Sequence, residues 1–225
     1  MSRKEQFAEN EFYHIYNRGT DKRTIFVDKA DYDRFIRLLY VCNNAVSVVM
    51  KELRTFNFSQ LTSAVSERTP LVAIGAYCLM PNHFHLLIKQ VIRDGISMFM
   101  KKLLTAYAMY FNEKNDRSGG LFEGTFKSSR IKDDNYLKYL FAYIHLNPIK
   151  MVDSSWKEEG IKDMSRVSEY LKKYEYSSYL DFIGSHRPEG AIINRDSEVF
   201  PVYFENNFEF NDFIESWMNY KKDDI

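Results

Sequence analysis

Cysteine is scarce in this chain, and long apolar runs are missing. Only Cys42 and Cys78 occur in 225 residues, which excludes a disulfide framework and a four-cysteine zinc site. No apolar run approaches the roughly 18 residues that a membrane span needs. Residues 1–12 include basic residues but lack the apolar segment of a secretory signal. We therefore expect a soluble, cytoplasmic protein with no membrane partner.

The chain also lacks a net charge, although its charged residues are distributed unevenly. The chain has 31 Lys and Arg and 31 Asp and Glu, yet residues 1–88 carry +2, residues 89–150 carry +5 and residues 151–225 carry −7. A basic middle segment favours a phosphate-backbone partner, because each neutralised phosphate releases counterions. A solvated helix face is the alternative interpretation. The acidic tail is more typical of a packed or regulatory appendage.

The pattern of apolar residues predicts alternating strands and helices. Strands are expected at residues 12–18, 71–80, 83–90 and 121–131. Helices are expected from Asp31 to Asn43-Asn44, at 96–114 and at 133–147, the last ending at Pro148. Residues 44–70 are interpreted as an inserted helix plus loop. This order, with one hairpin in the middle, predicts an α+β fold with helices packed on a sheet.

The first candidate site is the sequence His83-Phe84-His85. Successive side chains of a strand point to opposite faces, so the two imidazoles project together, about 6–7 Å apart. Such a pair can converge on one divalent ion, and an oxygen third ligand would leave positions open for a substrate. The alternative is that two histidines coincide on a half-exposed strand. His14, on the first strand, is a candidate extra ligand.

The second candidate is the predicted helix at 133–147. Tyr143 and Asn147 are one turn apart, so one element could supply a nucleophile and a metal-facing oxygen. Most of the 16 tyrosines must serve packing, so the pattern alone does not separate Tyr143 from its competitors. Those competitors are Tyr107, Tyr110, Tyr136 and Tyr139. His145, two residues after Tyr143, is expected to point away from it.

Three segments in this order resemble the IS200-like transposase superfamily, and most of all its REP-associated tyrosine transposase branch. They are AYCLMPNHFHLLI, YFNEKNDRSGGLFEGTFKS and YLKYLFAYIHLNPIKMV, followed by EYSSYLDFIG at 175–184. The resemblance implies an HUH single-strand endonuclease domain at residues 1–150, with a ferredoxin-like antiparallel sheet. Residues 151–225 would form an acidic, mostly helical C-terminal extension.

The resemblance also implies roles for particular residues. His83 and His85 match the metal-binding histidines, Asn147 matches the third ligand, and Tyr143 matches the nucleophile. The implied activity is a metal-dependent strand transferase that forms a 5′-phosphotyrosine intermediate, with Mg²⁺ or Mn²⁺ as cofactor and single-stranded or hairpin DNA as partner. Both a monomer and a homodimer stay open, because the acidic tail would block or replace the dimer surface of compact relatives.

DNA contacts are expected mainly from the basic middle segment. The candidates are Arg18, Lys101, Lys102, Lys127, Arg130 and Lys132. Ordinary surface charge is the alternative for each of them.

Two rival functions stay open at this stage. A non-catalytic module that binds single-stranded or hairpin nucleic acid would keep the fold but have no use for a nucleophile. A metallohydrolase with water as the attacking group would need further carboxylate or imidazole ligands near the histidine pair, and none is close in sequence.

Overall fold

The computed structural model describes residues 6–46, 53 and 55–219. Its centre is an antiparallel sheet in the order β2-β3-β1-β4. The strands are β1 (Phe12–Arg18), β2 (Val72–Met80), β3 (His83–Gln90) and β4 (Lys127–Arg130). This is the order of two interleaved β-α-β units, as in ferredoxin-like folds. The predicted α+β class is confirmed.

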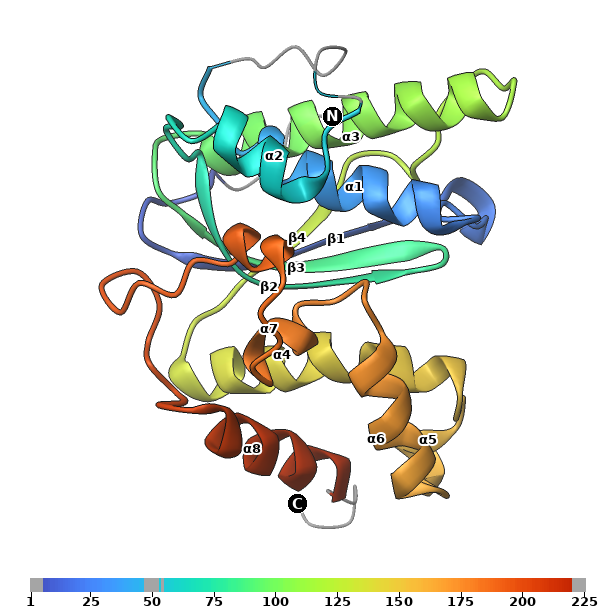
Figure 1. Cartoon of the computed structure of the whole chain (residues 1–225), viewed down its shortest axis with the longest axis vertical. Helices are drawn as coiled ribbons and strands as arrows, with labels where there is room; N and C mark the ends of the chain where they lie inside the picture. Colours follow the sequence, from blue (N-terminus) through green and yellow to red (C-terminus); the bar gives the residue numbers. More distant parts are fainter. Residues whose placement is uncertain (1–5, 47–52, 54, 220–225) are drawn as a thin grey trace.

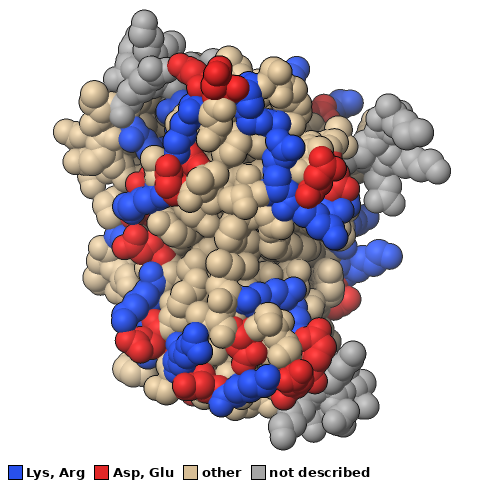
Figure 2. All heavy atoms as spheres, turned by 90° about the vertical axis from the view of Figure 1, so that its right-hand side faces the viewer, with Lys and Arg blue, Asp and Glu red and all other residues tan. Residues whose placement is uncertain are grey.

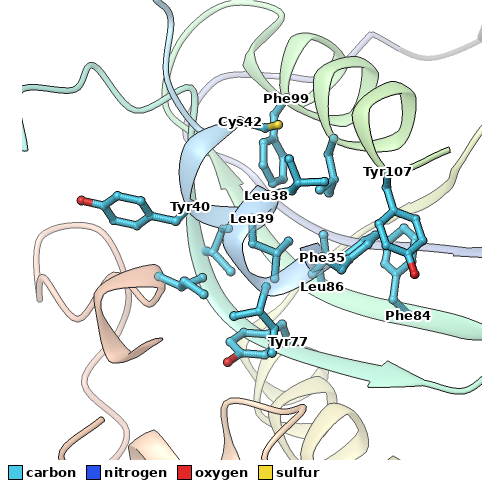
Figure 3. Packing of buried hydrophobic residues seen from close by; sticks show 14 of the residues in the cluster. Phe35, Leu38, Leu39, Tyr40, Cys42, Tyr77, Phe84, Leu86, Phe99 and Tyr107 are labelled. Carbon is cyan, nitrogen blue, oxygen red and sulfur yellow. The ribbon is translucent and has the colours of Figure 1, made fainter. Parts of the chain in front are cut away.

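Two long helices cover one face of the sheet, above it in Figure 1. They are α1 (Lys29–Val41) and α3 (Gly95–Lys114). Alternate strand residues such as Phe84 and Leu86 point into the layer between sheet and helices and meet Phe35 and Tyr107 there (Figure 3). Each such fully buried side chain contributes about 1.5–3 kcal/mol. This layer is the main hydrophobic core.

Helix α1 begins two residues earlier than the sequence predicted. Asp28 caps it, because its carboxylate accepts a hydrogen bond from the backbone N–H of Asp31. The pattern predicts Asp31 as the start, but its side chain is fully buried and accepts hydrogen bonds from Val27 N–H and from the Lys114 ammonium. Charge alone does not distinguish a cap from a buried carboxylate one turn later.

Helix α4 (Asp134–Leu146) covers the opposite face of the sheet, below it in Figure 1. Its residues Leu140 and Ile144 pack against Ala76, Cys78 and Leu87 of the strands. Asp133 caps the helix, and the five-residue 3₁₀ turn Asn147–Met151 follows it directly. A stripe at helical spacing predicted this helix correctly to within one residue at each end.

The C-terminal residues add further helices around α4, with α8 (Asn207–Asn219) below it in Figure 1. The others are α5 (Trp156–Glu159), α6 (Met164–Lys173) and α7 (Tyr179–Phe182). Phe210 of α8 and Leu171 of α6 share a buried cluster with Ala142 and Leu146 of α4. The extension is therefore mostly helical, as predicted.

Ser177 and Ser178, in the segment EYSSYLDFIG, connect this extension to the edge of the sheet. Ser178 N–H donates to the Tyr77 carbonyl at 2.9 Å, and Tyr77 N–H donates to the Ser178 hydroxyl at the same distance. Ser177 forms an isolated bridge with Cys78. These bonds occupy part of the outer side of β2, which would otherwise present unpaired backbone groups to solvent.

The fourth strand is shorter than the sequence predicted. Residues 121–126 are irregular, apart from one bridge between Phe122 and Gly19, and β4 covers only Lys127–Arg130. Gly124 has a φ of +66°, a left-handed conformation that ends regular pairing. The alternation of apolar residues in the sequence does not predict such a turn of the backbone.

The segment that the sequence predicts as an insertion contains the short helix α2 (Phe58–Ala64), capped by Asn57 and Gln60. This agrees with the predicted helix plus loop, although residues 47–52 and 54 of that prediction lie outside the described residues. Within the part of the chain that the structure describes, no helix combines the length and apolarity of a membrane span.

Candidate active site

The two histidines of β3 lie side by side on the face of the sheet that α4 covers. Their ring centres are 5.0 Å apart with an interplanar angle of 85°. Phe84, between them, points into the other face. His85 is only 6% exposed, whereas His83, at the hairpin turn, is partly exposed. The predicted convergence of the two imidazoles on one side is thus present.

A third histidine joins the pair from the neighbouring strand. In the register of β1 and β3, His14 pairs with Leu87, and its Nε2 lies 2.9 Å from Nδ1 of His85. His83 has its own partner, because its Nδ1 lies 2.6 Å from Oδ1 of Asn82. An amide oxygen only accepts, so this Nδ1 carries the hydrogen and Nε2 of His83 has the free lone pair.

Tyr143 brings its phenol ring to these imidazoles from α4. Its ring centre is 5.3 Å from that of His85 and 5.8 Å from that of His14, with edge-on angles of 81° and 75°. Asn147, one turn later, is 2% exposed, and its Nδ2 donates to the Tyr143 carbonyl at 2.7 Å. That bond leaves the amide oxygen of Asn147 available as an acceptor or ligand.

Burial is the main cause of the shifted pKa values of the site's histidines. It lowers the pKa of His14 and of His83 to about 4, with Lys150 and Arg18 adding to the effect at His83. The pKa of His85 is held well below its ordinary value by burial and then by the neighbouring histidines. All three imidazoles are therefore neutral at neutral pH, the form that binds metal ions.

The donor set suits a divalent cation held by two imidazoles and an amide oxygen. His83 has a free Nε2, and His85 has one if its Nδ1–H donates to His14. Among the described residues, no group of three or more His, Cys, Asp and Glu side chains is arranged for a metal. His14 is engaged with His85 through its Nε2, so it is better suited to orient that ring than to serve as a further ligand.

Burial also governs Tyr143. It raises the pKa of the phenol, and the Asn147 side chain partly opposes the shift. The Lys157 ammonium lies 4.4 Å from the centre of the Tyr143 ring, and burial lowers the pKa of this lysine. The ammoniums of Lys150 and Lys157 both act on His85. The site is therefore positively charged at one side and supplied in part by the C-terminal extension.

Sequence reasoning missed Lys157 and the positioning contact of His14. Lys157 belongs to the acidic extension, and the pattern WKEEG contains nothing that connects it with Tyr143, 14 residues earlier. A search for basic residues next to aromatic ones would have found Trp156-Lys157, but it would also have selected many residues far from the site. His14 was considered, but as a ligand.

The competing tyrosines differ sharply in their positions. Tyr107 is fully buried and donates its hydroxyl to the Ile25 carbonyl on the far side of the sheet. Tyr110, on the same helix, donates to Asp31 at 3.1 Å. Tyr136 and Tyr139 share α4 with Tyr143 and are each 37% exposed. Tyr143 is the one of these tyrosines with ring contacts to His14 and His85 among the described residues.

His145 points away from the candidate site, as expected. It is fully buried against α8, with its Nε2 2.8 Å from the Ser178 hydroxyl and its ring 5.4 Å from that of Phe210. Burial lowers its pKa to about 3.

Two of the predicted DNA contacts lie near the histidines. Arg18 pairs with His83 in the register of β1 and β3, although its guanidinium also binds the carboxylate of Glu123. Lys127 pairs with Tyr16, which lies on the same face as His14, and its side chain is exposed. The edge of the sheet beside the site is therefore basic.

The structure does not bring the remaining four candidates to the site. Lys102 donates to the carbonyls of Asn44 and Ala45, and Lys101 is exposed on the same helix, α3, which packs on the opposite face. Arg130 binds Glu11 at 2.6 Å, and Lys132 is exposed in the loop before α4. Their roles in DNA binding stay predictions.

The end of the sheet at which β3 begins and α4 ends points to the right in Figure 1, and Figure 2 shows this face. Uncharged residues form much of its centre. Lys and Arg side chains surround them, interspersed with Asp and Glu. Charged side chains of both signs therefore lie mostly at the margin of this face rather than at its centre.

Comparison with known proteins places the chain in a family. A solved structure described as a REP-associated tyrosine transposase bound to a REP hairpin is 12% identical, with a TM-score of 0.47, and the match covers 84% of this chain and 90% of that one. Among curated proteins, none matches significantly. The family model described as "Transposase IS200 like" matches residues 12–147, which is more than half of the sequence. The chain therefore belongs to the IS200-like transposase family.

Proposed function

We propose that this protein cleaves and rejoins single-stranded DNA in a metal-dependent reaction, with Tyr143 as the nucleophile. The observation that carries the proposal is the 5.3 Å separation between the ring centres of Tyr143 and His85. These two residues belong to different elements and are 58 positions apart, so sequence proximity does not account for their meeting. Membership of a transposase family supports the same chemistry.

The reaction is a transfer of the phosphodiester to the tyrosine. The phenolate oxygen of Tyr143 attacks the phosphorus, the bond from phosphorus to the 3′ oxygen breaks, and the 3′ oxygen leaves as a hydroxyl after taking up a proton. The product is a 5′-phosphotyrosine link, which keeps the phosphoester bond for transfer to another strand. The return step has the same balance, with an incoming 3′-hydroxyl as nucleophile.

His83, His85 and Asn147 are the residues that would hold the cation, Mg²⁺ or Mn²⁺, with the imidazoles favouring the softer ion. When bound, it would neutralise the anionic oxygens of the scissile phosphate and so make attack by a phenolate feasible. Asn82 and His14 would fix the ring orientations of His83 and His85 through the contacts at 2.6 and 2.9 Å.

Tyr143 must lose its proton to react, and burial opposes that loss by raising its pKa. Lys157 faces the ring from 4.4 Å, so its positive charge favours the phenolate electrostatically. Its position over the ring makes it a stabiliser of negative charge.

The proposed substrate is single-stranded DNA next to a hairpin. One structural neighbour is bound to a REP hairpin, and we extend this kind of partner to the present chain by proposal. Arg18 and Lys127 at the site edge are the basic side chains best placed to contact the backbone.

The decisive experiment is covalent capture. Wild-type protein, Tyr143→Phe and Tyr136→Phe are incubated with Mn²⁺ and a labelled pool of hairpin oligonucleotides that carry randomised single-stranded flanks. A denaturation-resistant adduct is expected with wild type and with the matched control Tyr136→Phe, and none with Tyr143→Phe or with excess EDTA. Cleavage by wild type and Tyr143→Phe alike would point instead to a hydrolase, and binding without cleavage to a non-catalytic module.

A further inference from the structure

Both tryptophans of the chain line one cavity, and that cavity adjoins Tyr143. It lies between α4, α5 and α8 and has a volume of about 340 Å³. Its walls include Tyr139 and Tyr143 from α4, Trp156 from α5 and Trp217 from α8. The chain has two tryptophans in all, so their meeting here from residues 61 positions apart is a distinct feature of the tertiary structure.

The walls are aromatic on several sides. The ring centres of Tyr139 and Trp217 are 5.5 Å apart at 62°, and those of Tyr139 and Tyr143 are 5.9 Å apart. The indole N–H of Trp156 is buried and has no hydrogen-bond partner among the described residues. A volume near the lower limit of ligand pockets has room for one flat group the size of a nucleobase.

The cavity also carries a positive charge. The Lys157 ammonium lies 4.4 Å from the ring centre of Tyr143 and 5.5 Å from that of Trp156, and Lys157 itself is among the lining residues. Glu158 is exposed and contributes the one carboxylate among those residues. A flat aromatic group joined to an anion matches this combination of aromatic walls and a neighbouring ammonium.

We propose that this cavity receives one unpaired DNA base next to the scissile phosphate, while Lys157 contacts a phosphate oxygen of the same nucleotide. The inference rests on the proposed function, because Tyr143 is a wall of the cavity. It assigns the C-terminal extension a direct part in holding the DNA strand. Stacking on aromatic rings accepts every base, so the pocket positions the strand without reading its sequence.

Intrinsic fluorescence tests the pocket directly, since both tryptophans line it. Tyr143→Phe protein, which cannot form the adduct, is titrated with the hairpin oligonucleotide that the capture experiment selects, or with the tightest-binding member of the pool if no adduct forms. We expect the tryptophan emission to be quenched on binding. The matched control is Phe208→Ala, a change on the same helix at a side chain that is 80% exposed. It is expected to leave the quenching intact.

An abasic series identifies the base. Each nucleotide that flanks the cleaved phosphate, or each unpaired nucleotide beside the hairpin if no phosphate is cleaved, is replaced in turn by an abasic unit. Binding is then measured for the wild type, Trp217→Ala and Trp217→Phe. One abasic position is expected to weaken wild-type binding about 5- to 150-fold, the range for loss of one stacked base. For Trp217→Ala, the same abasic substitution should change the binding affinity very little. For Trp217→Phe, it should again weaken binding, but by less than in the wild type.

The outcomes separate the two proposals. If the adduct forms but emission is unchanged and every abasic position costs less than about twofold, the pocket proposal is overturned and the proposed function stands. If no adduct forms but one abasic position matters in the wild type and not in Trp217→Ala, the pocket is a nucleic-acid site and the proposed function fails.

Discussion

Nε2 of His14 lies 2.9 Å from Nδ1 of His85, so two buried imidazoles on neighbouring strands share one hydrogen bond. Both rings are neutral at neutral pH because burial lowers their pKa values. One nitrogen donates and the other accepts, and Nε2 of His85 takes no part in this hydrogen bond.

His14→Phe should therefore weaken metal binding without removing a ligand. The ring of His85 loses the partner that orients it, and such losses typically cost 10- to 100-fold in metal affinity. Calorimetric titration with Mn²⁺ measures the effect. His14→Gln, which can still hydrogen-bond, should lose less than His14→Phe. Equal affinity of wild type and His14→Phe would show that the contact does not support a metal site.

Acid should destabilise the fold through His145. Burial lowers its folded pKa to about 3, whereas an unfolded histidine titrates near 6.5. The unfolded state thus binds the proton first, and stability is lost as the pH falls from about 6.5 towards 3. Between pH 7.5 and pH 4.5 the loss attributable to this residue is about 2–3 kcal/mol.

Urea unfolding of wild type and His145→Gln at these two pH values tests the prediction. His14 and His83 titrate in the same direction in both proteins, so the difference between the two losses isolates His145. A wild-type loss no larger than that of His145→Gln would contradict the assignment.

Two ion pairs of equal length should differ strongly in their contribution to stability. Lys114–Asp31 and Lys173–Glu169 are both 2.6 Å long, but the Asp31 side chain is 0% exposed and that of Glu169 is 66% exposed. Asp31→Asn should lower the free energy of unfolding by about 3 kcal/mol, because the amide has lost the charge and has one oxygen where the carboxylate uses two, one for Val27 N–H and one for the Lys114 ammonium. Lys173→Ala should change it by less than about 1 kcal/mol. Chemical denaturation of the two variants makes the comparison, and similar losses would refute it.

Gly75 should tolerate no side chain while Phe200 is present. A Cβ at this bulge of β2 would lie 2.6 Å from a ring carbon of Phe200. Gly75→Ala is expected to cost about 1–3 kcal/mol of stability, as overpacking does. In a double-mutant cycle with Phe200→Ala, the cost of Gly75→Ala should fall by about 1 kcal/mol or more. Strict additivity of the two changes would show that the contact is not the cause.

Local patterns accounted for much of the architecture. The bounds of β3 at His83–Gln90 were predicted without error, and α4 to within a residue at each end, because apolar periodicity and the stops at Pro81 and Pro148 act within a few residues. The start of α1 and the length of β4 were wrong, since a buried carboxylate and a left-handed glycine do not alter the apolar pattern.

Spacing along the chain was enough to predict which side chains share a face. A spacing of two puts His83 with His85 on a strand, and a spacing of four puts Tyr143 with Asn147 on a helix. Three relationships came from packing: the strand and the helix face each other, His14 meets His85, and Trp217 and Lys157 of the extension lie beside Tyr143. The reason is physical. Spacing along one element follows from backbone geometry, whereas contacts between distant segments depend on how whole apolar faces pack.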